Sequence, residues 1–537
     1  MLELKDIATR PAFDVIVVGG GATGAGVARD CALRGLSTLL LERDDYATGA
    51  TGRNHGLLHS GARYAVADRA NAAECIAENH ILHTIANHCL ENTEGLFVGL
   101  TAEDLEYQSV LVESCRQAGI GASVVTAAEA LRLEPALNPD LKGAVVVPDA
   151  TINPFSLTHA NLLDARRHGA VTLAGVRVER LVVEADRVTG VKVVEVRSGT
   201  TATLHAAVVV NAAGIWGGRL LATAGIVLPM LPAKGAMLVM SGRPCKRVVN
   251  RCRPPGNGDI LVPDGTVSIL GTTSERVDFE QVDNLCVTDA ERRLLLAEGQ
   301  QLVPALASMP IMRAYAGVRP LVADDSDPTG RAVSRGIVCL DHATRDGIDG
   351  LVTITGGKLI TYRLMAEQAT DLVCAKIGLS APCQTATTPL PGSETPAFIA
   401  PRPHTPQRRH GTLAAQMSAI DGDRTIVCEC EGVTLGEIRY AINTLGATSL
   451  DDLRRRTRIG MGQCQGRQCA CRALGLIAQL LNPESAQADI ARFLTERWKG
   501  IQTSGPDNAL LQAQLINDML DQLGVGHLAC QHQQDTP

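Results

Sequence analysis

The chain has few aromatic residues and no long apolar run. Aromatic side chains make up 3% of its 537 residues, against 52 glycines, which indicates many tight turns and close backbone approaches, as in nucleotide-binding proteins. No apolar stretch reaches the roughly 18 residues that a membrane-spanning helix needs. The first ten residues, MLELKDIATR, carry charges where a signal peptide has its apolar segment. We therefore expect a cytoplasmic chain with no transmembrane segment.

An excess of positive charge is also lacking. The formal net charge is −7 at pH 7, which argues against a general nucleic-acid binder, because such proteins are basic. Hydrophobic residues are 45% and charged residues 20% of the chain, so disorder is excluded as its main state. The length predicts several domains, or one large domain with a smaller one.

Cysteine, in contrast, is plentiful, with 16 residues. Disulfides are not expected in a large cytosolic chain, so a clustered subset points to a metal site. Eleven of the cysteines are isolated, and we expect them to behave as small buried hydrophobes. The other five fall within residues 428–471.

The sequence predicts four parts. Residues 1–378 form an α/β domain, in which a Rossmann-like part and an inserted antiparallel-sheet part are interleaved. Residues 379–425, rich in Pro, Thr and Ser, form a linker. Residues 426–482 form a small helical, cysteine-marked unit, whose first helix opens with a Thr434/Glu437 capping box. Residues 483–537 form a partly helical tail to which we assign no chemistry.

A dinucleotide-binding fingerprint lies near the start. Residues 14–42 read as strand, glycine turn, helix and strand, and the turn carries Gly19, Gly21 and Gly24 in the G-x-G-x-x-G spacing. Glu42 ends the second strand 18 residues after Gly24, where a carboxylate binds ribose hydroxyls. FAD and NAD share this pattern, the acid disfavours NADP, and a glycine turn without a ligand is the alternative.

Further segments carry a family resemblance. The opening DVIVVGGGATGAGVARDCALRGLSTLLLER resembles the start of the FAD-dependent glycerol-3-phosphate dehydrogenases, a family within the D-amino-acid-oxidase-like flavoproteins. The segments at 47–64, 211–216, 261–275, 313–321, 332–337 and 355–363 follow in the family's order. The cysteine-marked C-terminus is most similar to the large subunits of the anaerobic members.

The resemblance implies a reaction and partners. It implies that FAD oxidises sn-glycerol 3-phosphate to dihydroxyacetone phosphate. It also implies a second catalytic subunit, which can hold FMN, and an iron–sulfur subunit that anchors the complex to the inner membrane and passes electrons to quinone. The chain would then be peripheral, on the cytoplasmic side of that membrane.

The resemblance also implies site residues. A phosphate dianion needs several cationic donors, and the matched segments offer Arg63, Arg319, Arg335 and Lys358. His59 is the candidate base, with a structural histidine as the alternative, and Tyr64 is a candidate for orienting substrate. The candidate cofactor contacts are Gly19, Gly21, Gly24, Glu42, Arg43, Thr51, Asn54, Gly214, Gly357, Lys358 and Leu359. Ser60 replaces a glycine of the family's loop, and we expect it to place a hydroxyl near the substrate.

The clustered cysteines form two pairs. Cys428-x-Cys430 is followed after 33 residues by Cys464-x4-Cys469, which resembles the BFD type of 2Fe-2S domain with its four thiolates. Cys471 is an alternative to Cys469, and structural zinc is an alternative to iron. Four arginines between the pairs (Arg454, Arg455, Arg456 and Arg458) are expected to offset the negative charge of the cluster.

Two other functions remain open at this point. One is an amino-acid or opine dehydrogenase of the same superfamily, which needs a carboxylate site that a single arginine satisfies. The other is a non-catalytic electron-transfer subunit that binds flavin for structure only. The set of four cations favours a phosphorylated substrate over the first of these.

Overall fold

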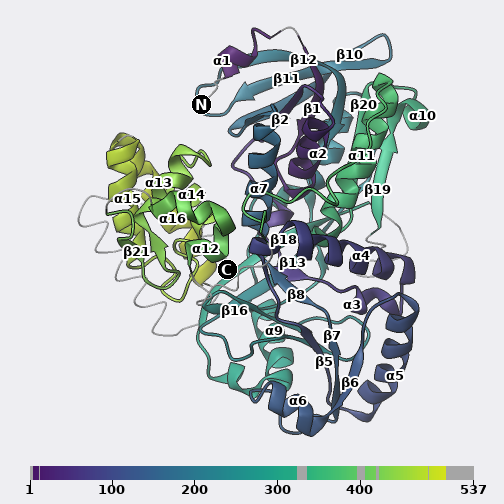
Figure 1. Ribbon diagram of the computed structural model, residues 1–537, viewed down its shortest axis with the longest axis vertical. Coiled ribbons are helices and arrows are strands. Elements are labelled where there is room, and N and C mark those ends of the chain that lie inside the picture. The colour runs from purple at the N-terminus through teal and green to yellow at the C-terminus, as the bar shows by residue number, and fades with distance from the viewer. Residues whose placement is uncertain are drawn as a thin grey trace, which may run out of the picture.

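The computed structural model describes residues 4–10, 12–322, 336–395, 405–418, 422–481 and 483–502, apart from the side chains of 483–488. Figure 1 shows two large sheets, one above the other, with a smaller C-terminal unit beside them. In this described part of the chain, no helix has the length and apolar character needed to cross a membrane.

The first large sheet is the predicted Rossmann-like one, with eight strands in total. Its central path is β9 (Val171–Leu173), β2 (Thr38–Leu41), β1 (Phe13–Val18), β12 (Thr201–Asn211), β20 (Leu351–Gly356) and β19 (Ile337–Asp341). The strands from β9 to β20 are parallel, and β19 is antiparallel. The first half of β12 instead pairs with β11 (Arg187–Glu195), which pairs with β10 (Val176–Glu184).

Both faces of this sheet are covered, which explains its nearly continuous apolar strands. In β1, Val15 and Val17 face one core and Ile16 and Val18 the other, because successive side chains point to opposite faces. The first core is closed by α2 (Ala22–Leu33), α7 (Pro154–Arg167) and α11 (Tyr362–Ile377). The second is closed by β10 and β11. A parallel sheet held in this way presents the ends of its strands to a ligand.

The second large sheet is the inserted one. Its order is β18 (Ile311–Val322), β13 (Met230–Met240), β16 (Val267–Gly271), β15 (Ile260–Asp264), β14 (Val248–Arg251), β5 (Gly95–Gly99), β7 (Gly143–Val147) and β6 (Ser123–Thr126), with β17 (Glu275–Arg276) also on β13. All pairs are antiparallel except β14 with β5. The predicted mixed α/β architecture is thus confirmed.

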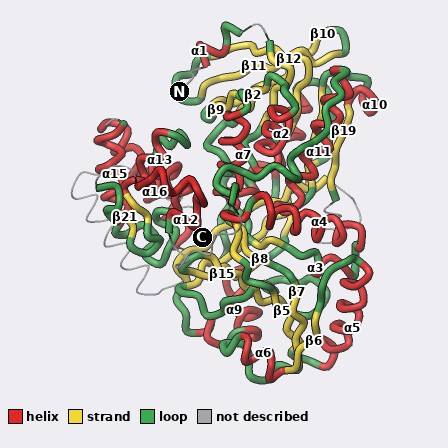
Figure 2. Tube along the Cα trace, viewed as in Figure 1, coloured by secondary structure: helices red, strands yellow, loops and turns green. Residues whose placement is uncertain are grey.

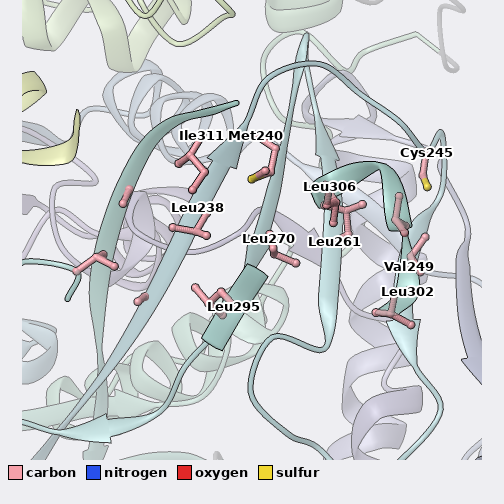
Figure 3. Packing of buried hydrophobic residues seen from close by; sticks show 14 of the residues in the cluster. Leu238, Met240, Cys245, Val249, Leu261, Leu270, Leu295, Leu302, Leu306 and Ile311 are labelled. Carbon is pink, nitrogen blue, oxygen red and sulfur yellow. The ribbon is translucent and has the colours of Figure 1, made fainter. Parts of the chain in front are cut away.

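One face of this second sheet is covered by α9 (Asp289–Leu302) and α6 (Ala127–Leu133). Leu295 of α9 packs beside Leu238 and Leu270 of the strands (Figure 3). This core packs against β13 and β18, and β18 carries the candidate site residue Arg319.

Shorter elements surround the two sheets. They include α1 (Leu4–Ile7), β3 (Leu57–Leu58), α3 (Ala62–Ala65), α4 (Arg69–Ile85), β4 (Leu90–Glu91), α5 (Ala102–Gln117), β8 (Ala150–Ile152), α8 (Gly217–Ala222) and α10 (His342–Asp346). Residues 379–395 run along this domain, where the Leu390 amide donates to the Ile85 carbonyl at 2.8 Å.

The C-terminal unit is almost wholly helical (Figure 2). It contains α12 (Pro406–His410), β21 (Ile426–Cys428), β22 (Val433–Thr434), α13 (Leu435–Asn443), α14 (Leu450–Thr457), α15 (Cys469–Leu480) and α16 (Pro483–Ile501). Half of the predicted capping box forms, since the Thr434 hydroxyl accepts from the Glu437 amide at 3.2 Å. The Glu437 carboxylate instead pairs with Arg409 and His410 of α12.

Ion pairs dock this unit on the flavin domain. Asp45, just after β2, accepts from Arg455 at 2.5 Å and Arg456 at 2.8 Å. Arg458 donates to Asp264 and to Glu431, both at 2.9 Å. The prediction that these arginines offset the cluster's charge is therefore wrong for three of the four, because the carboxylates at the domain interface take them.

Candidate active site and iron–sulfur site

One cavity of about 920 Å³ gathers the sequence-predicted residues. It runs between the two large sheets. Its lining includes Gly19, Gly21, Glu42, Arg43, Thr51, Asn54, His59, Arg63, Tyr64, Gly214, Arg319, Gly357, Lys358 and Leu359. Of the predicted flavin and substrate positions that the structure describes, Gly24 and Ser60 lie outside this lining. Arg335 lies outside the described residues.

The glycine turn begins the cavity. Gly19 has φ of +112°, and a Cβ there would lie 2.5 Å from the Ala212 carbonyl oxygen, so a side chain has no room. A Cβ on Gly24 would lie 1.9 Å from the Gly19 carbonyl oxygen. Gly24 thus lets α2 pack on the turn, and this packing brings the first amides of α2 to the cavity, where a pyrophosphate binds well.

The end of β2 forms the nucleotide side of the cavity. The Glu42 carboxylate accepts from the amides of Gly20 at 2.7 Å and Asp44 at 3.0 Å, which fixes its position. Burial raises the pKa of Glu42. Arg43 stacks on the Trp216 ring, 4.3 Å from its centroid, so this end offers a carboxylate and a flat cation–aromatic surface.

The loop after β2 crosses the middle of the cavity. The Thr51 hydroxyl accepts from the Ala22 amide at 3.0 Å, and thus caps α2 from outside the helix. The Asn54 amide group donates to the Thr51 carbonyl at 2.6 Å, and its oxygen accepts from the Gly56 amide at 2.7 Å. These bonds hold the loop rigidly against the glycine turn.

The predicted strand, Gly-Gly turn and helix at 350–378 are present as β20, a short 3-10 turn and α11. A Cβ at Gly357 would lie 2.4 Å from the Met365 sulfur, and its φ is +63°. Lys358 follows directly. Its Nζ donates to the Asn71 side chain at 2.7 Å and lies 4.9 Å from the centroid of the Tyr64 ring.

Two arginines reach the same end of the cavity. Arg319 of β18 donates to the Thr272 hydroxyl at 2.7 Å and the Thr273 carbonyl at 3.0 Å. Arg63 of α3 pairs with Asp259 at 3.0 Å. Among the described residues, its Nη1 is buried without a hydrogen-bond partner, and so is the indole nitrogen of Trp216. Such buried donors fit a ligand rich in acceptor atoms.

His59 and Tyr64 stand together at this end. The His59 ring is buried and lies edge-on to Tyr64, with 5.4 Å between the ring centroids. The ring of His55 lies 5.9 Å from that of His59, measured between centroids, and lines the cavity as well. The structure therefore brings together the candidate base, the candidate orienting phenol and the cations.

One expectation fails and two residues were missed. Ser60 is fully buried and outside the cavity lining, and its amide donates to Asp149 at 2.6 Å, so it does not offer a hydroxyl to substrate. Asn71 of α4 was missed because its role depends on Lys358, far away in the sequence. Arg53 also lines the cavity, and its position within the matched loop was the available signal.

The four predicted cysteine ligands lie in two touching loops. A Cβ at Gly462 would lie 2.7 Å from the Cβ of Cys430. The thiols of Cys428, Cys464 and Cys469 are in mutual hydrogen-bonding contact, which lowers the pKa of Cys464 and raises that of Cys469. Cys471 is exposed, so the geometry favours Cys469 as the fourth ligand.

The predicted donor set consists of four cysteine thiols. In the described part of the chain, no three or more His, Cys, Asp or Glu side chains are arranged to hold a single metal ion. Four thiolates shared between two irons are the ordinary ligands of a 2Fe-2S cluster. Of the isolated cysteines, seven are buried as expected, Cys339 and Cys383 are half-buried, Cys286 is exposed, and Cys530 lies outside the described residues.

A second cavity, of about 1460 Å³, separates the flavin domain from the C-terminal unit. It is lined on one side by residues of α14 and α16, and on the other by the loop after β2. Thr48, Arg53 and Asn54 line both cavities. Arg43, Val176 and Leu285 line both cavities as well, so the two cavities adjoin along the loop after β2 and beside β10.

Comparison with known families agrees with this geometry. A model of the FAD dependent oxidoreductases matches residues 14–363, and a model of the BFD-like 2Fe-2S binding domain matches residues 426–479. The chain therefore belongs to the FAD-dependent oxidoreductases and carries a BFD-like domain at its C-terminal end. The predictions of FAD, a 2Fe-2S cluster and an oxidoreductase are confirmed, and zinc is set aside.

Within this class, the chain is similar to subunits of the anaerobic glycerol-3-phosphate dehydrogenases. One subunit of the anaerobic glycerol-3-phosphate dehydrogenase of Escherichia coli K12 is 54% identical over 513 residues, which are 93% of this chain and 95% of that protein. The predicted family resemblance is thereby confirmed. Because this relative is named as one subunit, it implies a larger enzyme with other subunits.

Solved structures establish the fold but not the substrate. The glycerol-3-phosphate dehydrogenase of Bacillus halodurans, complexed with FAD, has a TM-score of 0.68 at 23% identity, over 99% of this chain and 98% of that one. Glycine oxidase of Geobacillus kaustophilus has a TM-score of 0.57 at 20% identity, over 71% and 98%. Because enzymes for an alcohol phosphate and for an amino acid share this fold, the choice of substrate depends on the site.

Proposed function

We propose that this chain oxidises sn-glycerol 3-phosphate to dihydroxyacetone phosphate. The observation that carries the proposal is that Arg63, Arg319 and Lys358 all line the FAD-type cavity. The candidate base His59 lines it as well, and both His59 and Lys358 lie against the Tyr64 ring. The high identity to the Escherichia coli protein supports the same substrate.

The three cations bind the phosphate. A phosphate dianion carries several acceptor oxygens, and arginine offers it a bidentate pair of donors, whereas lysine acts as a point charge. Asp259 offsets part of the Arg63 charge and holds its guanidinium in place, so that the free Nη1 meets the ligand. Charge-assisted hydrogen bonds of this kind contribute about 1.5–3 kcal/mol each.

His59 removes the proton of the substrate hydroxyl, and Tyr64 orients the substrate beside it. An imidazole with an ordinary pKa near neutrality suits this transfer. Bound FAD supplies the acceptor for the hydride from C2. The residues around it, including Gly357 and Leu359 at the turn after β20, exclude water from the reacting end.

The electrons then leave through the C-terminal unit. Cys428, Cys430, Cys464 and Cys469 hold the 2Fe-2S cluster, which accepts electrons singly. The residues that the two cavities share make the flavin site and the cluster unit neighbours. From there, electrons pass to a second catalytic subunit, to an iron–sulfur subunit on the cytoplasmic face of the inner membrane, and then to quinone.

Anaerobic absorption spectra test this function. We expect a flavin band with iron–sulfur shoulders that sn-glycerol 3-phosphate bleaches. The Arg319→Ala variant should keep its flavin and lose the bleaching. Arg276→Ala is the matched control, because Arg276 is exposed and pairs with the same residue of β13, Ala233, from its other side.

Each other outcome selects another function. Bleaching by an amino or opine acid, but not by the phosphate ester, would show a dehydrogenase for such acids. A spectrum that no small donor changes would show an electron-transfer subunit.

A further inference from the structure

The last described helix, α16, covers the cysteine loop. A Cβ at Gly466 would lie 2.6 Å from the Phe493 ring, and one at Gly460 would lie 3.4 Å from it. Both glycines have positive φ and flank Cys464 in the sequence. The helix lies beyond residues 426–479, which the BFD-like family model matches. It is therefore an addition to that domain, placed directly over its ligand loop.

An arginine sits in the buried stripe of this helix. The stripe consists of Ile490, Phe493, Leu494, Arg497 and Ile501, the spacing of a helix face packed on a core. Arg497 is 7% exposed. An arginine at such a position is rarely buried to this extent unless it has a partner.

Among the described residues, no carboxylate pairs with this guanidinium. Its Nε and Nη2 are buried without a hydrogen bond. The nearby cations Arg467 and Arg313 repel it, and the groups that attract it are the thiols of Cys464 and Cys469. A buried charge without compensation is costly. An anionic group at the cysteines would compensate this charge.

We propose that Arg497 is the electrostatic partner of the 2Fe-2S cluster and raises its reduction potential. Four thiolates make the cluster anionic, and reduction adds one further negative charge. A buried cation close to Cys464 and Cys469 stabilises the reduced form more than the oxidised form, since charge and hydrogen bonding around the sulfurs set such potentials. The inference depends on the cluster alone and not on the identity of the substrate.

A redox titration of the full chain tests this inference. The cluster is reduced stepwise with dithionite, which needs no substrate, and the reduced form is counted by its electron paramagnetic resonance. Arg497→Met removes the charge and keeps most of the volume. Arg492→Met is the matched control on the same helix, because Arg492 is 57% exposed and pairs with Asp489 at 3.1 Å.

We expect the reduced-to-oxidised ratio of Arg497→Met at a fixed potential to fall at least tenfold, which is about 59 mV for one electron. Arg497→Lys should restore most of the ratio, and Arg492→Met should match the parent. An unchanged ratio in Arg497→Met, with iron and sulfide content intact, would overturn the proposal.

Failure to load the cluster is also decisive. If Arg497→Met and Arg497→Gln both lack iron while Arg497→Lys retains it, the positive charge is needed for loading, which supports the proposal. If Arg497→Lys lacks iron as well, the shape of the side chain is what the helix needs, and the electrostatic role is refuted.

Discussion

Replacing Asp45 should slow the reduction of the cluster without changing the reduction of the flavin. Its carboxylate lies between Arg455 and Arg456, with exposed fractions of 10% for Asp45 and 1% for Arg456. Burial alone would raise the pKa of Asp45, but the two guanidinium groups hold it well below the usual range. Asp45→Asn removes the anion and leaves two buried cations at the interface.

The expected effect on docking is large. Removing one partner of a buried ion pair costs about 3–5 kcal/mol, which is a factor of roughly a hundred to a few thousand in the docking equilibrium. Asp45 lies outside the lining of the substrate cavity. We therefore expect the flavin to be reduced by substrate at the parent rate, and the cluster to be reduced much more slowly.

Anaerobic stopped-flow spectroscopy measures both rates in one experiment, through the flavin band and the iron–sulfur shoulders. Glu113→Gln is the control, because it breaks a pair with Arg116 on α5 that is exposed to solvent and therefore contributes little to stability. Equal cluster reduction in Asp45→Asn and the parent would refute the role of this pair in docking.

The pH dependence has a definite sign. A carboxyl whose pKa is depressed on folding stabilises the protein above its unfolded pKa, near 3.9, and this contribution is lost as the pH falls through the lower, folded value. The difference in the free energy of unfolding between the parent and Asp45→Asn should therefore be constant above about pH 5 and shrink in stronger acid. A difference that grew toward low pH would contradict this assignment.

Three further predictions concern the cofactor and substrate sites. Gly24→Ala should lose FAD, measured as flavin per chain, because its Cβ would meet the Gly19 carbonyl, and overpacking costs about 1–3 kcal/mol; full flavin content would contradict this. Lys358→Met should raise KM for the phosphate ester about ten- to a hundredfold, because a charge-assisted hydrogen bond to the phosphate is lost. The oxidation of unphosphorylated glycerol should be unaffected. An equal effect on both substrates would refute a phosphate contact. Cys469→Ser should lose iron and Cys471→Ser should retain it, and the reverse result would reassign the fourth ligand.

Local patterns predicted the fold well. The G-x-G-x-x-G turn between an apolar strand and a helix has few alternatives, and β1, α2 and β2 follow it. The Gly-Gly turn before Lys358 likewise fixed β20 and α11. These features depend on neighbours in the sequence, which is why sequence patterns identify them.

Long-range partners were beyond such reasoning. The sequence placed Lys358 at the cavity but not Asn71, which is 287 residues away and accepts a hydrogen bond from the Lys358 Nζ. Ser60 was expected at the substrate, but it is buried outside the cavity, where its backbone amide donates a hydrogen bond to the carboxylate of Asp149. Arg497 was hidden in a tail that has no motif, and its importance follows only from the packing of α16 on the cysteine loop.

The arginines of α14 were assigned to the wrong anion for a physical reason. Basic residues at the last turn of a helix are favoured by its dipole whatever their partners are. Here the end of α14 contacts both parts of the flavin domain. Arg456 pairs with Asp45, which follows β2 of the first sheet, and Arg458 pairs with Asp264 on β15 of the second sheet. Because the end of α14 pairs with residues of both large sheets, the C-terminal unit is held against both of them. The docking pairs therefore hold the C-terminal unit against the flavin domain, and in our proposal it is Arg497 of α16 that acts on the cluster.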